Sequence, residues 1–187
     1  MNERDWDKVA DSFEQEIFNV PENDTKGIIR NWVDSLAVPG AEATDLGCGV
    51  GRTLPMLADR YAQVYAVDVS SQCLEVAEKA NPGRRNITYV HADVSADKNG
   101  YPATDVVLCI NTWLNASLEI REGLIDRTCK GVKKGGHLLL VVPSLNSTLL
   151  TAYRHLQWNL RDGMDPREAQ KAAALNSKGL EHGIVRI

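Results

Sequence analysis

Five short apolar runs, rich in β-branched residues, recur along the chain between longer segments of helical spacing. Within each run the apolar character is nearly continuous, which is typical of parallel strands covered by helices on both faces. Strands that alternate with helices predict an α/β fold with a doubly wound, mostly parallel, Rossmann-like sheet. The predicted strands are AEATDL, AQVYAVD, NITYVHAD, TDVVLCI and GGHLLLVVP, at residues 41–46, 62–68, 86–93, 104–110 and 135–143.

Apolar residues at helical spacing predict helices between these strands and before the first one. In the helix before the fifth strand, Leu124, Ile125, Thr128 and Cys129 form the predicted apolar stripe, and the helix ends at KKGG. The predicted helices are 5–18, 25–38, 52–61, 70–81, 117–132 and 144–160.

Length and composition predict one folded domain of 187 residues. The predicted organisation is N-terminal helices at 1–38, a sheet core at 39–143 and a C-terminal helical cover at 144–187. The net charge is -4 and no basic run exceeds two residues, so a nucleic-acid partner is not expected. The N-terminus lacks the apolar core of a signal peptide and no apolar run approaches the length of a membrane span. We therefore expect a cytoplasmic protein without a membrane partner.

The cysteines and histidines do not predict a metal site or a disulfide framework. The four cysteines lie far apart with no C-x-x-C pair, and the histidines show no metal-ligand spacing. Reduced, mostly buried thiols are the expectation.

A glycine-rich loop follows the first predicted strand, in the stretch TDLGCGVGR. Gly47, Gly49 and Gly51 fall where ligands bind in open parallel sheets, at the carboxyl end of the first strand. Glycine allows unusual φ angles and a close approach of backbone to ligand. The spacing G-x-G-x-G followed by Arg52 departs from the dinucleotide fingerprint, which requires a small residue at that position. The loop does not fit a pyrophosphate, and a purely structural tight turn is the alternative interpretation.

Acidic residues lie at the ends of the first three predicted strands. Asp45, beside the loop, would repel a diphosphate and attract an ammonium or sulfonium group. Asp68 ends the second strand, where a carboxylate can accept both hydroxyls of a ribose, although a turn or helix-cap role is the alternative. Asp93 ends the third strand and can accept a hydrogen bond from an adenine amine, although alone it would more often form a turn.

These residues, DLGCGVG with Asp68 and Asp93 at the ends of the next two strands, resemble the class I S-adenosylmethionine-dependent methyltransferases over residues 30–145. The resemblance implies a sheet of order 3-2-1-4-5-7-6 with an antiparallel seventh strand, and S-adenosyl-L-methionine as cofactor. It implies that the loop glycines contact the methionine and ribose portions, and that Asp45 lies near the amino group. Asp68 would bind the ribose, and Asp93 with Val94 the adenine. The predicted cofactor-binding residues are Asp45, Gly47, Cys48, Gly49, Gly51, Asp68, Val69, Asp93, Val94 and Asn111.

The predicted reaction is methyl transfer to a small molecule, for which the protein must mainly align and desolvate the reactants. Asn111, Thr112 and Trp113 follow the fourth strand and should border the methyl group, with Trp113 as a candidate substrate contact. The motif NTWL lacks the prolines of enzymes that methylate amino groups of DNA bases. A helix after Pro143 can cover the acceptor pocket through Tyr153, although ordinary packing is equally compatible with its pattern. No catalytic residue is assigned.

Two other functions are compatible with the same residues. A non-catalytic S-adenosylmethionine-binding regulatory protein would keep the cofactor site without turnover. A nucleotide-dependent oxidoreductase is disfavoured by Arg52 and Asp45.

The end of the sequence also bears on the fold. The family order calls for two strands after the fifth, whereas the sequence ends at GIVRI, which offers only the beginning of a sixth strand. We therefore expect a truncated form that lacks the last strands and leaves the fifth strand with an unpaired apolar edge. Either the residues after Pro143 shield this edge, or a second copy of the chain pairs with it in a homodimer.

Overall fold

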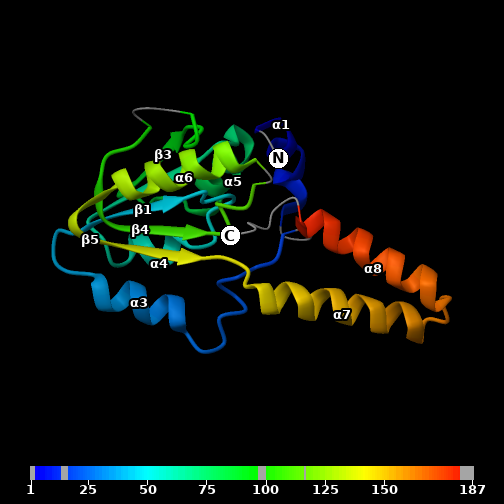
Figure 1. Cartoon of the computed structure of the whole chain (residues 1–187). Coiled ribbons are helices and arrows are strands. Elements are labelled where there is room, and N and C mark those ends of the chain that lie inside the picture. Colours follow the sequence, from blue (N-terminus) through cyan, green and yellow to red (C-terminus); the bar gives the residue numbers. More distant parts are fainter. Residues whose placement is uncertain (1–2, 14–16, 97–99, 116, 182–187) are drawn as a thin grey trace.

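The fold is a five-stranded parallel sheet with helices on both faces, seen in a computed structural model that describes residues 3–13, 17–96, 100–115 and 117–181 (Figure 1). The strand order is β3-β2-β1-β4-β5, and every neighbouring pair is parallel. This confirms the predicted α/β class and the predicted order of the first five strands. The strands are β1 (Glu42–Leu46), β2 (Gln63–Asp68), β3 (Ile87–His91), β4 (Thr104–Ile110) and β5 (Val132–Val141).

Helices connect β1 to β2, β2 to β3 and β4 to β5, where the spacing of apolar residues predicts them. The helix predicted at 5–18 is shorter in the structure, since residues 17–20 are not helical, and the helix at Pro166–Glu181 was not predicted. Ser70 caps the helix between β2 and β3 by accepting a hydrogen bond from the amide of Cys73. Both carboxylate oxygens of Asp24 accept amide hydrogen bonds at the start of the helix before β1. The helices are α1 (Glu3–Val9), the short 3-10 helix η1 (Ala10–Ser12), α3 (Ile28–Leu36), α4 (Leu54–Ala58), α5 (Ser71–Ala80), α6 (Leu118–Lys130), α7 (Leu145–Arg161) and α8 (Pro166–Glu181).

Two apolar clusters form the core, one on each face of the sheet. Successive residues of β4 alternate between them: Val106 and Leu108 pack with α3, α4 and α5, whereas Val107 and Cys109 pack with α6. Figure 1 shows α3 and α6 on opposite sides of the sheet. The sheet is therefore covered on both faces, as the continuous apolar runs predict.

The buried stripe of α6 differs from the predicted one. Leu124 and Thr128 are buried as expected, but Ile125 is 40% exposed and Cys129 is exposed, so their assignment to the stripe was wrong. Arg121 is buried in their place, and its guanidinium donates to the carbonyl of Asn115 at 2.6 Å. The buried row of α6 is Arg121, Leu124 and Thr128, at positions i, i+3 and i+7. A search for apolar residues alone misses this row because its first member is an arginine.

β5 lies at one end of the strand order, and the two helices that follow it form a hairpin. Figure 1 shows α7 and α8 side by side, extending away from the sheet. No strand follows β5 among the residues described up to 181, and the expected sixth strand at GIVRI lies outside them. Pairing of the β5 edge with a second copy stays a prediction. Within the described ranges, every helix is too short or too polar to cross a bilayer.

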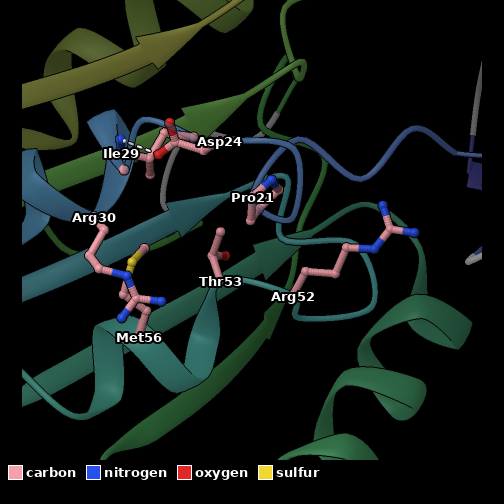
Figure 2. A pocket seen from close by; sticks show the side chains of 8 residues that line it. Pro21, Asp24, Ile29, Arg30, Arg52, Thr53 and Met56 are labelled. Carbon is pink, nitrogen blue, oxygen red and sulfur yellow. Dashed lines mark hydrogen bonds between the residues drawn. The ribbon is translucent and has the colours of Figure 1, made fainter.

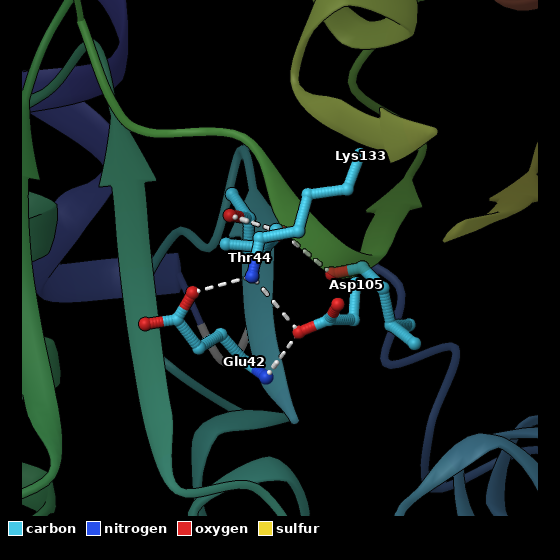
Figure 3. A network of polar contacts seen from close by, with 6 residues as sticks. Glu42, Thr44, Asp105 and Lys133 are labelled. Atoms are coloured by element: carbon cyan, nitrogen blue, oxygen red, sulfur yellow. Dashed lines mark hydrogen bonds and ion pairs between the residues drawn. The ribbon is translucent and has the colours of Figure 1, made fainter. Parts of the chain in front are cut away.

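A polar network joins the amino ends of three strands, opposite the glycine loop (Figure 3). The Asp105 carboxylate accepts from the amide of Glu42 at 2.9 Å and from the ammonium of Lys133 at 3.1 Å. Lys133 also donates to the Glu42 carboxylate at 2.8 Å. The hydrogen bond from the Glu42 amide is the main cause that lowers the pKa of Asp105. β1, β4 and β5 are thus tied together at the base of the sheet.

Two buried threonines form a directed pair beside this network. The hydroxyl of Thr104 donates to the carbonyl of Val106 at 3.0 Å. Because a hydroxyl has a single proton, Thr104 must accept the hydrogen bond that it shares with Thr44, also at 3.0 Å. Thr44 is therefore the donor of the pair.

This direction predicts unequal effects of two similar substitutions. Thr104→Val should lower the free energy of unfolding by about 1–3 kcal/mol, because it leaves the buried Thr44 hydroxyl without an acceptor. Thr44→Val should cost less, and adding it to Thr104→Val should recover part of the loss. Urea unfolding measures all three variants. If the two single variants lose equal free energies of unfolding and the double variant loses their sum, Thr44 is not the donor to Thr104.

Candidate functional site

The glycine loop at the carboxyl end of β1 has a backbone that requires glycine at three positions. Gly47, Gly49 and Gly51 have φ angles of 73°, 52° and 81°, all in the left-handed region. The amides of Gly47 and Cys48 both donate to the carbonyl of Val67, at 2.8 and 3.1 Å. The loop is thus folded back onto the end of β2.

Protein side chains lie against the loop at the positions where a Cβ would stand. A Cβ on Gly47 would clash with the side chain of Thr112, and one on Gly49 would come within 2.8 Å of the Phe13 ring. One on Gly51 would meet Ala77 at 2.9 Å. The bare backbone therefore serves the packing of Phe13 and Thr112 as well as any close approach of a ligand.

Asp68 fixes the loop to the sheet. Its carboxylate accepts from the amide of Gly49 at 2.8 Å and from the amide of Ser70 at 2.9 Å. The residue is 8% exposed, and burial raises the pKa of this carboxyl, although these hydrogen bonds oppose the shift. A carboxylate has about four acceptor sites, so the amides of Gly49, Ser70 and Val69 leave room for a predicted hydroxyl donor.

Asp45 is a second buried acid, in β1 directly before the loop. It is 2% exposed, and the hydroxyl of Thr53 donates to its Oδ2 atom. Desolvation raises the pKa of Asp45 to about 7; the Thr53 hydrogen bond opposes the shift and the nearby charge of Asp68 adds to it. The sequence indicated the carboxylate, but Thr53 carried no signal of its own.

The end of β3 holds the residues predicted to contact an adenine. Val94 is buried, whereas Asp93 is exposed and accepts from the amide and hydroxyl of Ser95, at 2.9 and 2.7 Å. Asp93 therefore forms a turn, the role it would more often have alone, and its contact with adenine stays a prediction. The carbonyl of Val69 lies 3.0 Å from Nε2 of His91.

The segment after β4 is held by the fold itself. Asn111 has a φ of 57°, and its amide donates to the carbonyl of Val141 at 2.8 Å. The hydroxyl of Thr112 donates to the carbonyl of Leu46 at 2.7 Å, which joins the ends of β4 and β1.

The two candidate substrate residues lie in different surroundings. The indole N–H of Trp113 donates to the hydroxyl of Thr128 at 3.1 Å, and the ring packs against the α6 core. Tyr153 is 56% exposed on the projecting hairpin. The structure thus gives Trp113 a packing role and leaves the substrate contacts of both residues as predictions.

A cavity of about 140 Å³ lies where the segment before α3 meets the start of α4 (Figure 2). Thr53 lines it and so connects it to Asp45. Figure 2 shows the Arg30 side chain beside Met56, and the guanidinium of Arg52 turned away from the cavity. The lining residues are Pro21, Asp24, Gly27, Ile29, Arg30, Arg52, Thr53 and Met56.

The family model of a methyltransferase domain matches residues 43–136, half of the chain, including the glycine loop and all three acids. The chain belongs to this family. The matched region runs from β1 to the first half of β5, which confirms the class I S-adenosylmethionine-dependent methyltransferase resemblance. S-adenosylmethionine is the cofactor that membership of this family assigns.

Similar proteins agree with this membership. The chain is 33% identical to a trans-aconitate 2-methyltransferase of Rhizobium etli over 54% of this chain and 38% of that protein. It is 32% identical to a ubiquinone biosynthesis O-methyltransferase of Idiomarina loihiensis over 60% of this chain and 45% of that protein. The chain thus matches less than half the length of these relatives.

Solved structures share the fold at low sequence identity. The structure named as a DhpI-SAM-HEP complex has a TM-score of 0.66 at 14% identity, and the match covers 79% of this chain and 67% of that one. A TehB-like methyltransferase from Corynebacterium glutamicum has a TM-score of 0.54 at 18% identity, over 74% of this chain and 71% of that one. The likeness supports the Rossmann-like methyltransferase fold.

The residues present fit this cofactor. S-adenosylmethionine carries an ammonium, a sulfonium and a ribose but no phosphate. The loop offers two buried carboxylates, and burial raises the pKa of Asp45 despite the Thr53 hydrogen bond, so a positive charge beside this carboxyl would be favourable. The guanidinium of Arg52, which could have favoured a phosphate, is instead directed to the carbonyls of Phe13 and Ile17.

Cofactor affinity should depend on pH through Asp45. An ammonium binds the ionised carboxylate, so below the pKa of about 7 binding must release a proton. Affinity should fall by up to about tenfold per pH unit as the pH is lowered from about 7 to about 5.5. Calorimetry in buffers of different ionisation enthalpy counts the protons released. The control Asp45→Asn should bind weakly with a flat profile, and a flat profile in the unmodified protein would exclude this role.

The raised pKa of Asp45 also affects folding stability, which should fall as the pH rises, whereas cofactor affinity should increase. A carboxyl whose folded pKa is raised from 3.8 to about 7 favours the folded state below about 4, and this contribution is lost as the pH rises through about 7. Asp45→Asn should therefore leave the cofactor-free protein at least as stable at pH 8 as the parent.

Loss of the Asp68 carboxylate should weaken cofactor binding by about 1.5–3 kcal/mol, because a charged acceptor is removed and the Gly49 amide is released. The surface variant Asp126→Ala, which breaks only an exposed pair with Lys130, serves as the matched control. Calorimetry compares the two. Unchanged affinity in Asp68→Ala would remove the ribose assignment.

Proposed function

We propose that this protein transfers the methyl group of S-adenosylmethionine to a small-molecule acceptor. The observation that carries the proposal is the pair of buried carboxylates, Asp45 and Asp68, at the ends of neighbouring strands beside a glycine loop that lacks the dinucleotide spacing. Such a site suits a nucleoside with positive charge and no phosphate. The match to the methyltransferase domain supports the same cofactor.

The two acids would hold different ends of the cofactor. Asp68 ends β2 and keeps acceptor sites for the ribose hydroxyls. Asp45 would compensate the α-ammonium. The α-carboxylate is attached to the same carbon as that ammonium, and Thr53 links Asp45 to the cavity that Arg30 lines. We therefore assign Arg30 to the carboxylate of the methionine portion.

When bound, the cofactor supplies a methyl group on a sulfonium, which a nucleophile of the acceptor displaces. The contribution of the chain is alignment and exclusion of water. Hydrogen bonds to the ends of β1 and β5 fix Thr112 and Asn111 beside the loop, so the border of the acceptor site is rigid.

Thiols near the site are unsuited to compete as nucleophiles. Burial is the main cause that raises the pKa of Cys109 to about 12 and that of Cys48 well above its ordinary range. Both stay protonated at neutral pH, and a protonated thiol is a poor nucleophile. The methyl group would therefore be kept for the acceptor.

The relatives support a small-molecule acceptor. They are named for the methylation of trans-aconitate, of phosphoethanolamine and in ubiquinone biosynthesis. The net charge of -4 gives no support to a nucleic-acid acceptor. The contacts of Trp113 and Tyr153 with the acceptor belong to this proposal and rest on their positions after β4 and on α7.

A binding test followed by a turnover test checks the proposed function. Calorimetry with S-adenosylmethionine should give a single site that Arg30→Met and Asp45→Asn weaken. Formation of S-adenosylhomocysteine is then followed with carboxylates, amines and phenols as acceptors. Acceptor-dependent product is the expected result. Tight binding without product from any acceptor class would favour a regulatory binding protein, and the lack of any binding would overturn the proposal.

A further inference from the structure

The first described segment of the chain packs against the glycine loop. This segment, residues 3–13, comprises α1, η1 and Phe13, and we call it the N-terminal cover. Ala10 is buried in a small apolar cluster with Val50 of the loop and Cys73 of α5. Figure 1 shows α1 beside α5, at the end of the sheet where the loop lies.

One end of the cover is attached where β2 and β3 end. The carboxylate of Asp7 accepts from the hydroxyl of Ser70 at 2.6 Å, and Glu3 lies 3.0 Å from Nε2 of His91. Ser70 also caps α5 and donates its amide to Asp68. Asp7 is therefore connected through Ser70 to Asp68, the predicted ligand of the ribose.

The other end is attached by Arg52. Its two terminal nitrogens donate to the carbonyls of Ile17 at 3.1 Å and Phe13 at 3.3 Å. The guanidinium carbon lies 5.0 Å from the centre of the Phe13 ring, within the range of a cation–π contact. The same ring faces Gly49 and lies 6.3 Å from the ring of Trp6.

The cover touches both residues that Asp68 holds. The Asp68 carboxylate accepts from the amides of Gly49 and Ser70. Phe13 packs on Gly49, and Asp7 binds Ser70. The positions of the cover, the loop and the carboxylate are therefore mechanically linked.

We propose that Arg52 is a positioning residue that latches the N-terminal cover onto the glycine loop and so controls how fast the cofactor is released. The proposal rests on the proposed cofactor site. Arginine suits this role because its planar fork reaches two carbonyls and stacks on a ring at once, whereas a lysine ammonium cannot do all three. Arg52, which departs from the dinucleotide spacing, thus makes contacts that require an arginine.

The latch is tested first without cofactor. Hydrogen exchange of the peptide covering residues 3–13 reports opening of the cover. Arg52→Met should speed this exchange by about tenfold, and Arg52→Lys should also speed it, because a bidentate contact to two carbonyls is lost. The matched control is Arg84→Met, which removes a surface arginine paired with Asp59. Exchange in β1 and β4 should stay unchanged in every variant, as a check on the fold.

The second measurement follows release of S-adenosylhomocysteine by stopped flow. Release should be about tenfold faster in Arg52→Met and in Phe13→Ala, as expected when a closing element is loosened. Combining the two should add little, because Arg52 acts by placing the Phe13 ring. Phe13→Ala also keeps the test valid if Arg52→Met does not fold.

The outcomes separate the latch from the cofactor assignment. Unchanged exchange in Arg52→Met would overturn the latch, whether or not cofactor binds. Faster exchange with unchanged release would show that the cover does not control the cofactor, and additive effects would show that Arg52 does not act through the Phe13 ring. If the unmodified protein binds neither S-adenosylmethionine nor its product, the proposed function fails, while the exchange experiment still decides the attachment of the cover.

Discussion

The carboxylate of Asp68 holds together the segments at the carboxyl end of the sheet. Two backbone amides, from Gly49 and Ser70, converge on it at 2.8 and 2.9 Å. Charge-assisted bonds of this kind are stronger than those between neutral groups, particularly where water is excluded. They set the entry of α5, the curvature of the glycine loop and, through Ser70 and Gly49, the seat of the N-terminal cover. One buried anion thus coordinates three segments that are distant in sequence.

Burial of two acids near each other is electrostatically unfavourable within the protein alone. Asp45 responds by an increase of its pKa to about 7, with burial as the main cause and Asp68 as a contributor. A ligand with positive charge would relieve this penalty, because its attraction to a carboxylate is stronger where water is excluded. Such a pair of acids would favour a cationic nucleoside over a diphosphate.

Much of the fold could be predicted because its signals are local in sequence. Continuous apolar strands, the serine cap at Ser70 and the glycines of the loop each have a direct physical meaning in a short window. The attachments between distant segments carry no such signal. Arg52 has its partners at Phe13 and Ile17, and Trp113 turns to Thr128, which no local pattern indicates. The same limit explains α6, where a buried arginine occupies a position that hydrophobic spacing assigns to apolar residues.

The hairpin of α7 and α8 should tolerate amino-acid substitutions on its surface better than the packed sheet does. Leu149, Leu150, Tyr153 and Trp158 are each at least half exposed, and Figure 1 shows the hairpin extending away from the sheet. Substitutions at such positions leave no cavity in a packed core, so they change stability little. The sequence of this arm is therefore free to diverge between related chains while the strands and the glycine loop stay fixed. Evolution could in this way alter what the molecule touches without rebuilding the domain that holds it.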